Sequence, residues 1–135
     1  MRVNKRRRGG IAIELLFVLP VLLAVLLASV EFSLWLTAQQ QVALAGREGA
    51  RVASTGGTEE EIQNAVRLVL GEPRYDRSTV TVTITDELGN PLTSGDPVAV
   101  VVQLPVRYVV PDLLAFIGLS IRNQVLVNQT VMRKE

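Results

Sequence analysis

The sequence contains no cysteine and no histidine. Without cysteine the chain forms no disulfide, carries no thiol nucleophile and offers no thiolate to a metal ion. Without histidine it lacks the commonest general base and the commonest protein ligand of transition metals. The acids that could form a catalytic carboxylate pair, Asp86, Glu87 and Asp112, lie in expected loops with no cleft-forming pattern around them. We therefore expect no enzyme, no metal site and no cofactor.

Aromatic residues are also scarce, at 4% of the chain, and positive charge is concentrated at one end. Five basic residues and no acidic residue fall within the first nine positions, whereas the whole chain has a net charge of +1. The remainder of the chain therefore carries a net charge of −4, and its basic residues are scattered. This pattern disfavours nucleic acid as a partner. We expect no small-molecule substrate either.

No charged residue occurs from Leu15 to Val30, which lies inside an apolar run that extends from Ile11 to Leu36. At about 1.5 Å per residue this run is long enough to span a hydrocarbon core of roughly 30 Å. The basic cluster precedes the run, which favours a cytoplasmic N-terminus and an exported C-terminal part. We therefore divide the chain into a basic leader (1–9), a transmembrane helix (10–36), an extramembrane helical extension (37–55) and an exported domain (58–135).

Two carboxylates interrupt the apolar run. A cleavable secretory signal would have a shorter apolar region, and a plain signal anchor gives no reason for Glu14. An intramembrane acid costs about 2.5–3.5 kcal/mol on insertion scales and suggests a function. Glu14 either reaches the inner headgroups or has such a function. Glu31 lies about 25 Å further along a straight helix, where we expect it to reach headgroups or water, with a contact to a partner subunit as the alternative.

The segment Arg6-Arg7-Arg8-Gly9-Gly10, followed by Glu14 and a long apolar helix, resembles the class III signal of type IV pilins and pseudopilins. In that pattern a prepilin peptidase cuts after the glycine and leaves glutamate as the fifth residue of the mature chain. Cleavage between Gly9 and Gly10 makes Glu14 the fifth residue, whereas cleavage after Gly10 makes it the fourth. We expect the first cut. Leu15 stands where the family usually has an aromatic residue.

Three motifs in order extend the resemblance: Glu14 to Pro20, Val30-Glu31-Phe32, and Ala45 to Arg51. Together they resemble the TadE-like family, the minor pseudopilins of tight-adherence (Tad/Flp) pilus systems. The resemblance covers roughly residues 6–54. It implies a single-pass protein of the bacterial cytoplasmic membrane that acts in assembly of a pilus or secretion apparatus. Its implied partners are a prepilin peptidase, other pseudopilins, Tad assembly-platform proteins and the lipid bilayer.

The resemblance also implies that Glu14 pairs with the α-amino group that cleavage creates on a neighbouring subunit. The alternative function is an uncleaved single-pass signal-anchor protein whose exported β-domain binds an envelope partner.

Small and apolar residues continue at alternating spacings of three and four beyond the membrane, which is typical of a helix-packing seam. The seam packs on the exported domain, on other subunits, or on both. Pro20 cannot donate a hydrogen bond to the carbonyl of Leu16, so we expect a kink or local loosening there. Our candidate subunit-packing residues are Glu14, Pro20, Glu31, Ala38, Val42, Ala45 and Gly49.

The rest of the chain predicts a short helix followed by strands. Thr58 and Glu61 form a capping-box pattern, and Gly71 with Pro73 ends the helix. We interpret the acidic residues that begin this helix as matched to the helix dipole rather than as a cation site.

Residues 79–85 alternate apolar and polar residues, with Val80, Val82 and Ile84 on the inward face. Further strands are expected at about 98–109, with Val98 to Tyr108 sharing one face at every second position, and at 119–132. Pro105 argues for an edge strand or a break. The apolar segment 110–118 either forms a core turn or dips onto the membrane surface or a partner. The predicted class is α+β, with a long N-terminal helix, a short second helix and a three-stranded antiparallel sheet.

Overall fold

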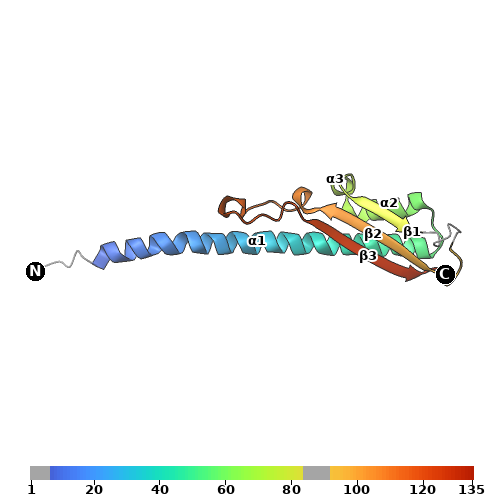
Figure 1. Ribbon diagram of the computed structural model, residues 1–135, viewed down its shortest axis with the longest axis horizontal. Coiled ribbons are helices and arrows are strands. Elements are labelled where there is room, and N and C mark those ends of the chain that lie inside the picture. The colour runs from blue at the N-terminus through green and yellow to red at the C-terminus, as the bar shows by residue number, and fades with distance from the viewer. Residues whose placement is uncertain (1–6, 84–91) are drawn as a thin grey trace, which may run out of the picture.

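The computed structural model describes residues 7–83 and 92–135, so the predictions for Ile84, Asp86 and Glu87 lie outside the described residues. The fold is α+β, with a long N-terminal helix, a short second helix and a three-stranded antiparallel sheet, as the sequence predicted (Figure 1). The elements are α1 (Arg7–Ser54), α2 (Glu59–Leu70), α3 (Glu72–Tyr75), β1 (Thr79–Thr83), β2 (Pro97–Pro105), η1 (Val106–Tyr108), η2 (Ala115–Ile117) and β3 (Val125–Arg133).

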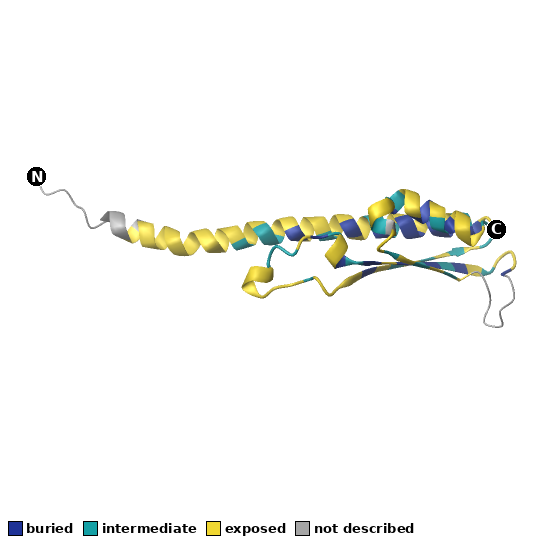
Figure 2. Ribbon diagram, turned by 90° about the horizontal axis from the view of Figure 1, so that it is seen from above, coloured by how far each residue is buried: buried dark blue, intermediate teal, exposed yellow. Residues whose placement is uncertain are grey.

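Helix α1 has 48 residues and continues through Pro20 as one helix. Its N-terminal half projects beyond the sheet and α2, and its C-terminal half packs on the sheet (Figures 1 and 2). In the projecting half the side chains of Leu16, Phe17 and Leu22 are 69%, 71% and 63% exposed. This helix is long and apolar enough to cross a membrane, and its exposed side chains are suited to contact with lipid.

Hydroxyl groups along α1 bond to the helix itself. Ser29, Ser33 and Thr37 each donate a hydrogen bond to the carbonyl four residues earlier, at 2.9, 2.8 and 2.9 Å. A hydroxyl that keeps such a partner can enter an apolar environment without leaving its donor unsatisfied. These residues are therefore compatible with the membrane-facing part of the helix and with its outer boundary.

The sheet has the order β1-β2-β3, and both pairings are antiparallel. The helices α1 and α2 cover one face of it, as Figures 1 and 2 show together. The inward residues of β2 face this helical layer and pair with those of the flanking strands, for example Val102 with Val80 and Leu104 with Leu126. The fully buried side chains of this layer are Val42, Ile62, Val66, Val98, Val100, Val102, Leu104 and Val106.

Two strand boundaries were predicted wrongly. The second strand ends at Pro105 rather than at 109, because Pro105 offers no N–H to the ladder and η1 follows it. Since β2 is the central strand, the edge position expected for Pro105 is wrong and the break is confirmed. Tyr108, in η1, leaves the inward face and is 43% exposed. The last strand begins at Val125 instead of 119, because the preceding residues form a loop along α1.

Helix α2 begins and ends where the sequence indicated. Thr58 accepts a hydrogen bond from the N–H of Glu61, whose carboxylate accepts one from the N–H of Thr58 at 2.8 Å, which completes the capping box. Gly71, at φ 78°, follows the last helical residue. Glycine readily adopts this positive φ, which turns the chain into α3.

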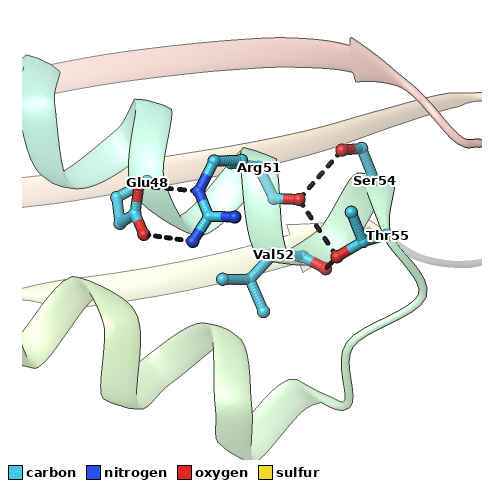
Figure 3. A network of polar contacts seen from close by, with 5 residues as sticks. All are labelled: Glu48, Arg51, Val52, Ser54 and Thr55. Atoms are coloured by element: carbon cyan, nitrogen blue, oxygen red, sulfur yellow. Dashed lines mark hydrogen bonds and ion pairs between the residues drawn. The ribbon is translucent and has the colours of Figure 1, made fainter.

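Hydrogen bonds between residues near in sequence satisfy carbonyl groups at the C-terminal end of α1 (Figure 3). Ser54 and Thr55 donate hydrogen bonds to the carbonyls of Arg51 and Val52, at 2.9 and 3.0 Å, so these carbonyls keep partners where the helix ends. Arg51 also donates two hydrogen bonds to Glu48 and thereby holds the pKa of that carboxyl below its ordinary value. The stabilisation from this exposed pair is present above the ordinary pKa of glutamate and is lost as the pH falls through the lowered pKa.

Candidate functional site

Glu14 is exposed on the projecting half of α1. Its neighbours Ile13 and Leu15 are 61% and 59% exposed, so the carboxylate lies within the apolar surface of the helix. It is available to another molecule because the chain's own sheet packs only against the opposite half of α1. This exposure is compatible both with a partner of positive charge and with contact to the inner headgroups.

Gly9 and Gly10 lie within the first turns of α1, because the helix begins at Arg7. Glycine destabilises a helix by about 1 kcal/mol relative to alanine. Two adjacent glycines consequently leave this end of α1 easy to unwind, which a protease that binds an extended backbone requires.

The small-residue seam packs on the chain's own domain. Ala38, Val42 and Ala45 are 3%, 1% and 0% exposed and belong to the core beneath the sheet. Gly49 is buried as well. The structure thus places the seam against the chain's own domain, and its contact with other subunits stays a prediction. Because these residues are buried within the chain's own core, they have no free surface for another subunit while the sheet stays in place.

Two glycines of α1 allow the sheet and α2 to approach the helix closely. A Cβ at Gly49 would lie 2.9 Å from Val66 Cγ2 and 3.3 Å from Val100 Cγ1. A Cβ at Gly46 would lie 2.5 Å from Asn128 Oδ1. Close packing within the domain thus favours glycine at position 49, whereas a side chain at position 46 would require the Asn128 side chain to move.

The sequence suggested that Glu31 reaches headgroups or water, but the structure buries this residue. Its side chain is 4% exposed, and its Oε2 accepts a hydrogen bond from the backbone N–H of Leu114 at 3.2 Å. The partner is thus the chain's own loop after η1, and the expectation of a solvated carboxylate is wrong. Leu114 and Glu31 also line the same apolar groove between the loop and α1.

We predict that Glu31→Leu releases the loop while the sheet remains folded. The variant leaves the Leu114 N–H without its acceptor in a half-buried position, which costs about 1–3 kcal/mol. Amide hydrogen exchange of residues 112–121 should become faster, and exchange of the β2 amides should not change. Glu31→Gln is the matched control, because its amide oxygen can still accept the hydrogen bond. Equal protection of the loop in Glu31→Leu and the native protein would contradict this account.

The loop between η1 and β3 runs back along α1 toward its N-terminus (Figure 1). At its base Ser120 donates a hydrogen bond to Asp112 at 2.6 Å. The other carboxylate oxygen of Asp112 is buried and has no hydrogen-bond partner among the described residues. Between the loop and α1 lies an apolar groove of about 290 Å³, lined by Ala28, Glu31, Phe32, Trp35, Leu114, Ile121 and Gln124.

The chain was compared with known families, curated proteins and solved structures. Residues 9–51 match the family model described as TadE-like protein. This segment of the chain is TadE-like. The match confirms the resemblance that the three motifs indicated, and it includes every candidate residue from Gly9 to Gly49. No curated protein and no solved structure gives a significant match.

The TadE-like segment lies entirely within α1. The helix that carries this match is also the one that is long and apolar enough to cross a membrane. Helix α2 and the sheet lie outside the matched residues, so the family resemblance concerns the helix and the structure adds the domain that packs on it. Among the described residues no group of three acidic side chains is placed to hold a metal ion.

Proposed function

We propose that this protein is a membrane-anchored minor pseudopilin that takes part in assembly of a Tad/Flp-type pilus or secretion apparatus, without enzymatic activity of its own. The observation that carries the proposal is the TadE-like segment with Glu14 exposed in the apolar surface of α1. A structural subunit needs a surface for its neighbours rather than a reaction centre. The projecting half of α1 offers such a surface.

A prepilin peptidase processes the protein between Gly9 and Gly10 in this proposal. The basic cluster holds the leader at the cytoplasmic face, where the peptidase acts. The helix-destabilising glycines allow the first turns of α1 to unwind into the protease site. Cleavage leaves a new α-amino group on Gly10 and makes Glu14 the fifth residue of the mature chain.

Glu14 then forms a salt bridge with the α-amino group of a neighbouring subunit. An unpaired carboxylate in the apolar bundle is costly, so the pairing selects one axial position between two helices. Pro20 lies further along the same half of α1, at the edge of a groove beside the loop, and is exposed, so it remains a candidate for contact with other helices. Ala38, Val42, Ala45 and Gly49 are not candidates in this proposal, because the chain's own domain covers them.

The protein resides in the bacterial cytoplasmic membrane as a single-pass protein, with a cytoplasmic N-terminus and the C-terminal domain outside. This orientation follows from the five basic residues before α1 becomes apolar. Its partners are the prepilin peptidase, other pseudopilins, Tad assembly-platform proteins and the lipid bilayer.

Deletion of the gene tests the pilus role. We predict that deletion removes surface pili or the secretion that depends on them, and that the native gene restores them. A copy that encodes a sheet-destabilised variant at normal abundance should restore them less well, because the exported domain would fail to hold its partners. Normal pili after clean deletion would contradict the proposed function.

A further inference from the structure

The loop between η1 and β3 places apolar side chains beside the part of α1 that is suited to crossing a membrane. The side chains of Phe116, Ile117 and Leu119 are 68%, 48% and 60% exposed. Two of them line a second apolar groove against α1, of about 390 Å³. Its lining residues are Pro20, Val21, Ala24, Val25, Ala28, Leu114, Ile117 and Leu119.

The position of this groove along α1 defines the depth of the loop tip. If the hydrocarbon core begins at Ile11, after the basic cluster, a span of about 20 helical residues ends at Val30. Ala24, in the middle of the contacted stretch, lies about 9 Å below Val30 along the helix. Interfacial segments bury their apolar side chains roughly 5–10 Å into the boundary between headgroups and acyl chains. The loop tip therefore lies at the level of the outer acyl chains.

Several backbone N–H groups of the tip have acceptors within the chain. The N–H groups of Ile117 and Leu119 both donate to the carbonyl of Leu114, at 3.1 and 3.3 Å, and the N–H of Gly118 donates to Ala115 at 3.1 Å. The carboxylate of Glu31 accepts a hydrogen bond from the N–H of Leu114. Backbone groups that enter hydrocarbon need such partners, because water cannot supply them there.

Two exposed arginines flank the loop at the next level outward. Arg107 and Arg122 line a polar groove together with Gln124, which also lines the groove around Glu31 and Trp35. Glu31 is the first residue beyond Val30, so this level corresponds to the lipid headgroups. A guanidinium presents donors in a geometry that matches phosphate. The apolar tip thus lies at the depth of the acyl chains, and the two arginines lie at the depth of the lipid phosphates.

We propose that the segment from Asp112 to Arg122, here called the wedge loop, inserts into the outer leaflet of the membrane. Phe116, Ile117 and Leu119 contact acyl chains, while Arg107 and Arg122 contact lipid phosphates. The partner is lipid rather than another protein, because the tip continues the exposed apolar surface of α1 at the same depth. The wedge loop gives the exported domain a second attachment that fixes its orientation on the membrane. The inference rests on the membrane span in the proposed function and is independent of the pilus role.

The absence of cysteine makes the test direct, because single cysteines have no background. Phe116→Cys probes the wedge loop, Val25→Cys the helix within the membrane, and Val127→Cys the exposed face of β3. The purified full-length variants are reconstituted at high dilution in vesicles of phosphatidylcholine and phosphatidylglycerol and treated with a membrane-impermeant maleimide. We expect Val127→Cys to react with the outward-facing fraction. Phe116→Cys and Val25→Cys should react slower by about ten-fold or more, because both thiols are shielded by acyl chains.

The three variants separate the possible failures. If Phe116→Cys reacts as fast as Val127→Cys while Val25→Cys stays protected, the wedge loop does not insert although the helix does. If all three react alike, α1 does not span the membrane, which contradicts the proposed membrane-anchored function.

A second measurement distinguishes lipid from protein as the source of protection. In a Trp35→Phe, Phe116→Trp variant the sole tryptophan reports on the loop tip. We expect lipids brominated on their acyl chains to quench its fluorescence. Protection from maleimide without such quenching would mean that the tip docks on a second copy of the chain, and would overturn the lipid assignment.

Discussion

Replacement of Glu14 with leucine is expected to abolish assembly of the proposed pilus while insertion and processing persist. The substitution removes a carboxylate that costs about 2.5–3.5 kcal/mol within the membrane, so the isolated protein should insert at least as well as before. The basic cluster and the glycines are untouched, so cleavage should continue. Assembly should fail because the α-amino group of a neighbouring subunit loses its partner, and an uncompensated buried charge costs about 3–5 kcal/mol.

Surface pili should be scored beside the ratio of processed to unprocessed protein for each Glu14 variant. Glu14→Asp is the matched control, since it keeps the charge on a shorter arm and should reduce piliation only in part. Normal pili assembled from fully processed Glu14→Leu protein would end the salt-bridge hypothesis. Glu14 would then be a residue that reaches the inner headgroups and has no role in subunit register.

Replacement of Ala45 with leucine is expected to destabilise the exported domain. Ala45 is 0% exposed within the layer between α1 and the sheet. Additional methylene groups at such a site force neighbouring side chains off their rotamers and cost about 1–3 kcal/mol, and occasionally more. In the detergent-solubilised full chain, hydrogen exchange of the β2 amides should become roughly 5- to 150-fold faster where exchange requires opening of the domain, since the exchange rate depends exponentially on that loss of stability.

Gln40→Leu is the matched control for this prediction, because Gln40 lies on the exposed side of the same helix. It should leave the β2 amides as protected as in the native protein. The sequence alone also allowed the opposite result, in which the seam contacts other subunits and the domain keeps its stability. Unchanged β2 protection in Ala45→Leu, with loss of crosslinks to partner subunits, would favour that interpretation over the structure.

The periodic parts of the fold followed from the sequence because each pattern has one favourable arrangement. A long apolar helix with small residues at helical spacing gave α1, the Thr58–Glu61 pattern gave the start of α2, and strict alternation gave β1 and the inward face of β2. The family resemblance located Gly9, Gly10 and Glu14 as well, since it depends on local motifs within α1.

The site around Glu31 could not be predicted in the same way. The hydrogen bond that buries Glu31 joins residues 83 positions apart, and no local pattern encodes that distance. The apolar segment 110–118 has the composition of a core turn, a membrane contact or a partner contact, so its sequence left three options. Only the path of the chain after Pro105, where β2 ends and η1 begins, directs this segment back along α1.

The intact mass of the membrane-bound protein tests the central claim most directly. Protein purified from the membrane fraction of cells with an active prepilin peptidase should lack residues 1–9, so that the mature chain begins at Gly10. The same protein from cells without the peptidase should keep them. Complete retention of Met1 to Gly9 in the presence of the active peptidase would contradict the account and favour an uncleaved signal-anchor protein whose exported domain binds an envelope partner.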